Sequence, residues 1–294
     1  MTNVAFLGTG LLGSGMVEGM LRRGDAVTVW NRTEEKARAL EAHGAKVARS
    51  PEDAVAAADQ IHMALPDDGV VDAIIAQLAP CLRPTAVVID HSTTSPAGTK
   101  GRLARCAKQG IRFLHAPVFM APQMCRESKG LMLVSGPTAI FEDVRAELAK
   151  MTGEVWYLGE RPDLAASYKL FGNLMIFAII AGIADVFAMA NGVGVSPADA
   201  LNLFSKFQVA GAIPARGAKM SRGDFSATFE LTMARKDLRL MIEAADGQPL
   251  AVLPAIAKRM DEAIAKGYGQ DDFGAIAAEL VISQNRGAGR SAGL

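Results

Sequence analysis

Cysteine is scarce in this sequence, which has three among 294 residues, Cys81, Cys106 and Cys125. An odd number of cysteines without a Cys-x-x-Cys pair indicates neither a disulfide framework nor a zinc site. The four histidines likewise show no metal-ligand spacing, so we predict no metal centre. Reduced thiols of this kind are typical of the cytoplasm, and we expect a cytoplasmic protein.

The chain also lacks a net charge, because 31 Lys and Arg residues balance 31 Asp and Glu residues. Proteins that bind nucleic acid or an anionic membrane surface usually carry an excess of basic residues. We therefore expect a small-molecule substrate, with no nucleic acid and no membrane as a partner.

One long apolar run, residues 174–195, contains Asp185 and Asn191 and follows Lys169. Few helices at the centre of a membrane tolerate such groups, so the run predicts a buried helix rather than a transmembrane span. It is nevertheless too apolar for one small domain to cover. We therefore expect a homodimer or a higher homo-oligomer.

Half of the residues are hydrophobic, and a chain of this length usually forms more than one core. Residues 1–163 alternate short apolar runs with helical stretches, which predicts an α/β Rossmann domain with a doubly wound parallel sheet. Residues 164–294 have helical spacing, which predicts an all-α domain joined by a long helix from about Ala166 to Asn191. The strands are expected at residues 4–7, 26–30, 45–48, 60–65, 86–90, 111–118, 131–135 and 155–158.

Several helix boundaries are also marked in the sequence. Ser50 and Ser196 are each followed by proline, which predicts an N-cap and a first helical residue at both places. A further helix is expected at residues 33–43, before a glycine.

A glycine-rich turn follows the first predicted strand. Residues 8–13 fit Gly-x-Gly-x-x-Gly and open an amphipathic helix, whose N-terminal N–H groups can hold a pyrophosphate. This context predicts a dinucleotide site rather than a turn that only packs a strand on a helix. The candidate cofactor-binding residues here are Gly8, Gly10, Leu11, Leu12 and Gly13.

The second predicted strand ends at Asn31, Arg32 and Thr33, where an NAD-binding unit usually places Asp or Glu for the ribose 2′-hydroxyl. Asn31 does not repel a 2′-phosphate, Arg32 can pair with it, and Thr33 can donate a further hydrogen bond. The turn therefore predicts NADP(H) as the cofactor. The alternative is that Arg32 is a solvated turn residue.

With these features the chain resembles the β-hydroxyacid dehydrogenase family, which includes 3-hydroxyisobutyrate and 6-phosphogluconate dehydrogenases and glyoxylate/succinic semialdehyde reductases. Residues 6–13 look like its N-terminal signature, and residues 90–96 look like its Asp-x-Ser-Thr-x-x-Pro segment. The resemblance covers nearly the whole chain. It implies that Leu65, Pro66 and Thr93 approach the nicotinamide and ribose of the cofactor.

The resemblance also implies a catalytic pair, a lysine on the interdomain helix with an asparagine four residues later. Lys169 and Asn173 supply both, although the first of the family's paired asparagines is Gly172 here. A spacing of four puts the two side chains on one helix face. A cationic amine suits an oxygen that gains charge as hydride reaches a carbonyl carbon, and Asn173 would orient that oxygen or the lysine. On spacing alone, Lys169 would be a solvated charge at a helix start.

Two further residues are implied by the resemblance. Lys236 lies in a segment similar to the family's Lys-Asp-Leu, which implies a position beside the cofactor with Asp237 as a local partner. The alternative is an exposed charge pair on a helix. Phe229 is expected to wall the substrate pocket.

The chain departs from the family at the expected substrate loop, residues 115–122. The family's Asp-Ala-Pro-Val-Ser-Gly-Gly loses its serine and both glycines here, which are replaced by Phe119, Met120 and Ala121. Donors for a substrate carboxylate are thereby lost, which favours a larger or less polar carbonyl compound. Arg126 or Lys129 could replace those donors, or each could be a solvated charge. The candidate pocket residues are Pro117, Val118, Phe119, Met120 and Phe229.

The sequence thus predicts an NADPH-dependent oxidoreductase that transfers hydride between the nicotinamide and a carbonyl or hydroxyl carbon, with reduction as the expected direction. Two alternatives remain. An imine reductase shares the Rossmann domain and the long helix; the apolar loop favours it, and Lys169 argues against it. A non-catalytic dinucleotide-binding protein is disfavoured by the presence of both Lys169 and Asn173.

Overall fold

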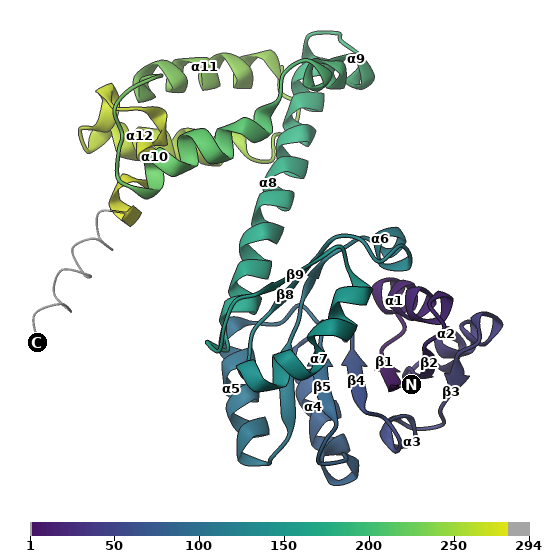
Figure 1. Ribbon diagram of the computed structural model, residues 1–294. Coiled ribbons are helices and arrows are strands. Elements are labelled where there is room, and N and C mark those ends of the chain that lie inside the picture. Colours follow the sequence, from purple (N-terminus) through teal and green to yellow (C-terminus); the bar gives the residue numbers. More distant parts are fainter. Residues whose placement is uncertain (1, 282–294) are drawn as a thin grey trace, which may run out of the picture. The chain divides into compact units, whose positions relative to one another are not determined.

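A computed structural model describes residues 2–281 of the chain (Figure 1). The chain forms two compact units, unit 1 up to Asn173 and unit 2 from Leu174 onwards. This boundary lies inside helix α8 (Leu164–Gly192), whereas the sequence analysis placed it at the start of that helix, between residues 163 and 164. Residue 1 and residues 282–294 of the two predicted domains lie outside the described range.

Unit 1 is built on a parallel sheet of six strands in the order β3-β2-β1-β4-β5-β6. The strand order reverses between β1 and β4, as it does in dinucleotide-binding Rossmann domains. The predicted fold class is therefore confirmed. The strands are β1 (Asn3–Leu7), β2 (Ala26–Trp30), β3 (Lys46–Val47), β4 (Gln60–Met63), β5 (Val87–Asp90) and β6 (Arg112–His115).

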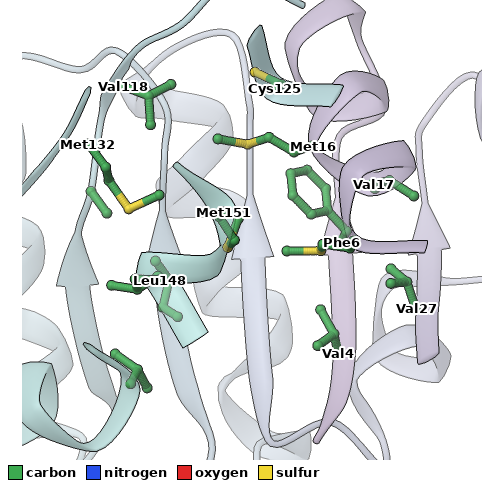
Figure 2. Packing of buried hydrophobic residues seen from close by; sticks show 14 of the residues in the cluster. Val4, Phe6, Met16, Val17, Val27, Val118, Cys125, Met132, Leu148 and Met151 are labelled. Carbon is green, nitrogen blue, oxygen red and sulfur yellow. The ribbon is translucent and has the colours of Figure 1, made fainter. Parts of the chain in front are cut away.

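Helices cover both faces of this sheet, because side chains alternate along each strand. In β1, Val4 and Phe6 belong to one hydrophobic cluster, and Ala5 and Leu7 belong to another. Figure 2 shows the first cluster, where Phe6 lies near side chains from the helices on that face. The helices of unit 1 are α1 (Leu11–Arg22), α2 (Glu34–Arg38), α3 (Pro51–Val55), α4 (Asp68–Leu78), α5 (Pro96–Lys108), α6 (Pro122–Arg126) and α7 (Thr138–Met151), with short 3-10 helices η1 (Glu41–His43) and η2 (Ala79–Cys81).

The strand predicted at residues 111–118 is wrong as a single element, because the chain forms two strands there. β6 ends at His115, and β7 (Val118–Phe119) belongs to a second sheet with β8 (Leu131–Val134) and β9 (Glu154–Tyr157). Pro117 lies between β6 and β7 and has no N–H to donate to a strand ladder. The break turns the following loop away from the main sheet.

The predicted helix starts are confirmed, but one helix is shorter than expected. Ser50 and Ser196 each accept a hydrogen bond from the backbone N–H three residues later. The helix predicted at residues 33–43 ends at Arg38 instead, and Leu40 follows it into the core before η1 begins. Local periodicity did not reveal this tighter turn.

Helix α1 presents glycines to α6, which lets the two backbones approach closely. A Cβ atom on Gly15 would lie 2.6 Å from the carbonyl oxygen of Pro122, and one on Gly19 would lie 2.6 Å from that of Cys125. Glu18, on the same helix, accepts a hydrogen bond from Arg126 Nε at 2.8 Å. The segment after the expected substrate loop is thereby fixed to the helix that follows the glycine turn.

Among its described residues, unit 2 has helices and no strands, with a hydrophobic cluster centred on α11 and α12. Asp185, which lies in the apolar part of α8, is buried and accepts hydrogen bonds from the backbone N–H groups of Ala251, Val252 and Leu253. It satisfies N–H groups that the start of α12 leaves without helical partners. The helices are α9 (Pro197–Asn202), α10 (Ala218–Ser221), α11 (Leu231–Ala244) and α12 (Leu253–Ala265), with short segments η3 (Leu203–Ser205), η4 (Val209–Gly211), η5 (Ile213–Gly217), η6 (Tyr268–Gln270) and η7 (Phe273–Ala277).

Most apolar side chains of α8 are not covered by the described residues of the single chain. Phe171, Leu174, Phe177 and Ile180 are each more than 60% exposed. By length and composition the helix could cross a membrane, and only 6% of its most apolar stretch is buried. The expectation of a buried helix is therefore wrong for one chain by itself.

Candidate functional site

A pocket of about 550 Å³ lies in unit 1 at the point where the strand order reverses. Leu7 pairs with both Trp30 and Met63, so the loops after β1, β2 and β4 leave the sheet at one edge. Such crevices are the usual ligand sites of open α/β sheets. The pocket is lined by Gly8, Gly10, Leu11, Leu12, Gly13, Trp30, Asn31, Arg32, Thr33, Lys36, Ala64, Leu65, Pro66, Val70, Ile74, His91, Ser92 and Thr93. All the cofactor residues predicted in unit 1 are brought together here.

At each glycine of the turn, a different steric feature explains why a side chain is absent. Gly8 has a φ of +95°, and a Cβ atom there would lie 2.3 Å from the carbonyl oxygen of Ala64. A Cβ atom on Gly13 would lie 2.0 Å from the carbonyl oxygen of Gly8. A Cβ atom on Gly10 would meet nothing within 4 Å, so its absence leaves space for a ligand beside the N-terminus of α1. This cradle fits the pyrophosphate of a dinucleotide.

Asn31 connects the end of β2 to the glycine turn. Its Oδ1 accepts a hydrogen bond from the backbone N–H of Thr9 at 3.0 Å, and its Nδ2 donates to the carbonyl oxygen of Thr33 at 2.8 Å. Both ends of the side-chain amide are therefore used within the protein. Asn31 shapes the pocket, and its amide also places no negative charge at the 2′ end of a bound ribose.

Two cations border the same end of the pocket. Arg32 and Lys36 are exposed, and the structure shows no ion pair for either among the described residues. Arg38, the next basic residue of α2, is instead paired with Glu34. A pair of uncommitted cations beside Thr33 fits a phosphate group better than a ribose hydroxyl.

The loop after β5 is fixed to the loop after β4. Ser92 Oγ accepts a hydrogen bond from the backbone N–H of Leu65 at 2.9 Å, and the Ser92 N–H donates to Asp90 Oδ1 at 3.0 Å. Thr93 follows with an exposed side chain on the pocket wall. Leu65, Pro66 and Thr93, which are predicted to contact the cofactor, thus lie on two loops that a hydrogen bond joins.

Asp90, at the end of β5, is a buried charged group next to these two loops. Asp90 Oδ2 lies 3.7 Å from Arg102 Nη1 and 3.5 Å from His115 Nδ1, and all three side chains are buried. Burial raises the pKa of the Asp90 carboxyl, but His115 and Ser92 more than offset this and leave it below its usual value. Arg102 is also held by Asp68 and Asp72, so α4, α5 and β5 are tied together.

Two buried histidines form a second polar chain. His91 Nδ1 is 2.7 Å from the carbonyl oxygen of Ala116, and His91 Nε2 is 2.9 Å from His62 Nδ1. Burial lowers the pKa of His91 to about 4 and holds that of His62 well below its usual value. Both rings are therefore neutral at pH 7, and His91 must donate through Nδ1 because a carbonyl oxygen only accepts. These contacts indicate packing rather than acid–base work, and no metal-binding group of His, Cys, Asp or Glu occurs within residues 2–281.

Lys169 lies on the first part of α8 and points at the expected substrate loop. Its Nζ donates a hydrogen bond to the carbonyl oxygen of Val118 at 2.8 Å and lies 4.1 Å from the centre of the Phe119 ring. The side chain is half-buried, and burial lowers its pKa. This geometry differs from that of a solvated charge at a helix start. Asn173 lies one turn further on and makes no side-chain hydrogen bond within the described residues.

The other loop residues divide between core and surface. The side chain of Val118 is buried in the cluster of Figure 2, so only its carbonyl oxygen faces Lys169. Met120 packs against the same cluster. Arg126 pairs with Glu18, and Lys129 pairs with Glu127, so neither is a free donor for a substrate carboxylate.

Lys236 and Phe229 belong to unit 2. Lys236 Nζ is 2.8 Å from Asp237 Oδ1, and both side chains are well exposed, which matches the simpler alternative of a surface ion pair. Phe229 packs edge-on against Phe273. The predicted roles of Lys236 at the cofactor and Phe229 at the substrate remain predictions.

Sequence reasoning missed several pocket residues. Lys36 could have been found, because it lies in the first turn of the helix that directly follows Arg32 and Thr33. Val70 and Ile74 also lie one helical turn apart, on α4, but they look like ordinary core positions in the sequence. The residues that were missed are Trp30, Lys36, Ala64, Val70, Ile74, His91 and Ser92.

Two family models match the chain. Residues 3–159 match the NAD binding domain of 6-phosphogluconate dehydrogenase, and residues 165–280 match the NAD-binding domain of NADP-dependent 3-hydroxyisobutyrate dehydrogenase. Together they cover both units. The expectation of a nicotinamide dinucleotide as the cofactor is confirmed.

Individual relatives extend this match. The chain is 30% identical over 282 residues to the human cytokine-like nuclear factor N-PAC, covering 93% of this chain but about half of N-PAC. It is 28% identical to Arabidopsis thaliana glyoxylate/succinic semialdehyde reductase 2, covering 97% of this chain and 81% of that protein. Among solved structures, Streptomyces aurantiacus imine reductase superposes with a TM-score of 0.87 at 26% identity, covering 95% and 99% of the two chains.

The neutral histidines predict a loss of stability in acid. In the unfolded chain both titrate near pH 6.5, whereas in the folded protein they stay neutral until a lower pH. Between about pH 6.5 and the pKa of each folded-state histidine, the unfolded state binds more protons than the folded state. As the pH is lowered through this range, the free energy of unfolding falls by roughly 1.4 kcal/mol per pH unit for each histidine. Urea unfolding followed by tryptophan fluorescence reports this for unit 1, because Trp30 and Trp156 both lie there.

His91→Gln is expected to reduce that pH dependence between pH 7 and 5. His43→Gln is the matched control, because His43 is exposed and its replacement should leave the slope unchanged. A stability that does not vary between pH 7 and 5 in the unsubstituted protein would contradict the prediction.

Proposed function

The chain belongs to the β-hydroxyacid dehydrogenase family, and we propose on this basis that it is an NADPH-dependent reductase that transfers hydride between the nicotinamide and a carbonyl or hydroxyl carbon. The observation that carries the proposal is the half-buried amine of Lys169, held against the strand-end loop of the unit that contains the dinucleotide pocket. The glyoxylate/succinic semialdehyde reductase supports reduction as the direction.

Bound NADPH supplies the hydride in this proposal, and the protein supplies the proton. As the carbonyl carbon gains hydride, its oxygen gains negative charge and takes a proton from Lys169 Nζ, which leaves a neutral amine that solvent reprotonates. Burial lowers the pKa of Lys169 and so makes the proton easier to give up. Asn173 lies on the same helix face with an uncommitted amide, which suits it to orient the oxygen.

Replacing Lys169 by methionine is expected to lower kcat roughly 100- to 10,000-fold, because the general acid is lost while the length and apolar volume of the side chain are kept. NADPH affinity should change little. The assay is NADPH oxidation, followed by absorbance, with one panel of aldehydes and ketones and a second panel of cyclic imines.

Lys108→Met, an exposed lysine on α5, is the control and should retain full activity. A Lys169→Met variant with normal turnover would rule out the proposed acid. Turnover confined to imines would favour the imine reductase, whose fold the chain shares. NADPH binding without turnover on either panel would favour a non-catalytic dinucleotide-binding protein.

The preference for NADPH over NADH is proposed to rest on Arg32, Thr33 and Lys36. Charge-assisted hydrogen bonds contribute about 1.5–3 kcal/mol each, so Arg32→Ala and Lys36→Ala should each raise the Kd for NADPH by roughly 10- to 100-fold. The Kd for NADH should change much less, because NADH lacks the 2′-phosphate. Isothermal titration calorimetry measures both constants.

Arg38→Ala is the matched control, because Arg38 lies on the same short helix but is paired with Glu34. It should leave both Kd values near those of the unsubstituted protein. Equal weakening of NADH and NADPH by Arg32→Ala would contradict the assignment, as would an unsubstituted protein that binds both equally.

We further propose that α8 is covered by a second copy of the chain. Its apolar side chains are exposed on nearly all sides, and a helix of that kind is usually buried. A membrane is the other possible cover, but Asp185 lies within this helix and is buried as the cap of α12. The balanced charge of the sequence also provides no excess of basic residues to attract anionic lipid.

Light scattering is therefore expected to give at least twice the 30.9 kDa mass of one chain. Phe177→Lys combined with Ile180→Lys should shift the protein toward the monomer, because two charges would be buried at the contact. Met124→Lys, on α6 of unit 1, is the control and should leave the measured mass unchanged. A monomeric unsubstituted protein, or one that sediments with lipid vesicles, would contradict the proposal.

The proposed setting is the cytoplasm, with a small-molecule substrate and without nucleic acid. All three cysteines are free, and burial raises the pKa of Cys106 and Cys125 to about 11. Thiols of this kind are mostly protonated and unreactive, as expected for structural cysteines in a reducing compartment.

A further inference from the structure

The ring of Phe119 fills the space between two residues of α8. Lys169 Nζ lies 4.1 Å from the centre of the ring, within cation–π distance. A Cβ atom on Gly172 would lie 2.2 Å from Phe119 Cζ and 2.6 Å from Cε1. Lys169 and Gly172 are three residues apart and therefore share the helix face that the ring contacts.

The amine has few other partners that could fix its position. One hydrogen bond goes to the carbonyl oxygen of Val118, and burial lowers the pKa of Lys169. No carboxylate within the described residues forms an ion pair with Lys169, and Asp163, which immediately precedes α8, is paired with Arg161. The ring and one carbonyl oxygen therefore supply the favourable electrostatic contacts of this ammonium.

We propose that Phe119 is a positioning residue for Lys169, holding its ammonium against the Val118 carbonyl oxygen, and that position 172 is glycine because the ring takes the space of a side chain there. The negative face of the ring favours the charged form of the amine, which opposes the effect of burial. The inference rests on the proposed function only where it concerns turnover. The packing of the ring and its effect on the amine are independent of it.

The first test replaces the ring while keeping an apolar side chain. Phe119→Leu removes the π face, so the pKa of Lys169 should fall, and the basic limb of the kcat pH profile should move about 0.5 to 1 pH unit lower. The same shift should appear in the pH dependence of acylation of the Lys169 amine, measured by peptide mass spectrometry without any turnover.

The second test examines the coupling between the ring and Gly172. Gly172→Ala should displace the ring and lower kcat, whereas in a Phe119→Ala background the same change should have an effect roughly 2- to 100-fold smaller. Gly101→Ala, on α5 of unit 1, is the matched control, because its Cβ atom would meet only the end of the flexible Arg105 side chain, at 3.2 Å. It should leave kcat and the acylation profile unchanged.

The outcomes separate this inference from the proposed function. No turnover on any substrate, together with an acylation profile that shifts in Phe119→Leu, would reject the reductase and retain the role of Phe119. Turnover that depends on Lys169, with both profiles unchanged in Phe119→Leu, would overturn the inference. Equal effects of Gly172→Ala in both backgrounds would also overturn it.

Discussion

The rest of the site depends on a close backbone contact between the end of β1 and the start of α1. The carbonyl oxygen of Gly8 lies where a side chain of Gly13 would be, and Gly8 itself packs against the backbone of Ala64 after β4. This contact aims the N-terminus of α1 into the crevice where the strand order reverses. The amide of Asn31 then joins the same turn to the end of β2, so three strands share one rigid corner.

A second close contact, between α1 and α6, fixes the loop that carries Phe119 near Lys169. Gly15 and Gly19 let α6 lie directly on α1, and the pair of Glu18 with Arg126 fixes it there. The chain between β7 and α6 is thereby held at both ends, and the Phe119 ring at its start meets Lys169. The position of the amine therefore depends on the same glycine-rich helix that shapes the dinucleotide pocket.

The sequence predicted the sheet, the glycine turn and the pocket residues of unit 1 because these follow local rules of spacing and turn chemistry. The predictions were wrong where contacts between distant residues determine the boundaries of an element or the partner of a side chain. Pro117 divides one predicted strand between two sheets, and Leu40 shortens a predicted helix by turning into the core. Arg126 was considered as a substrate donor, but its partner Glu18 lies about a hundred residues earlier, beyond the reach of any local pattern.

Helix α8 carries its functional residues unevenly. Lys169 and Gly172 precede the boundary at Asn173 and contact Phe119, whereas Asp185 follows it and caps α12. Substitutions before Asn173 therefore act on the amine and the ring of the proposed site, whereas a substitution of Asp185 acts on the start of α12. One continuous helix thus separates a chemical effect from a folding effect by position along the sequence.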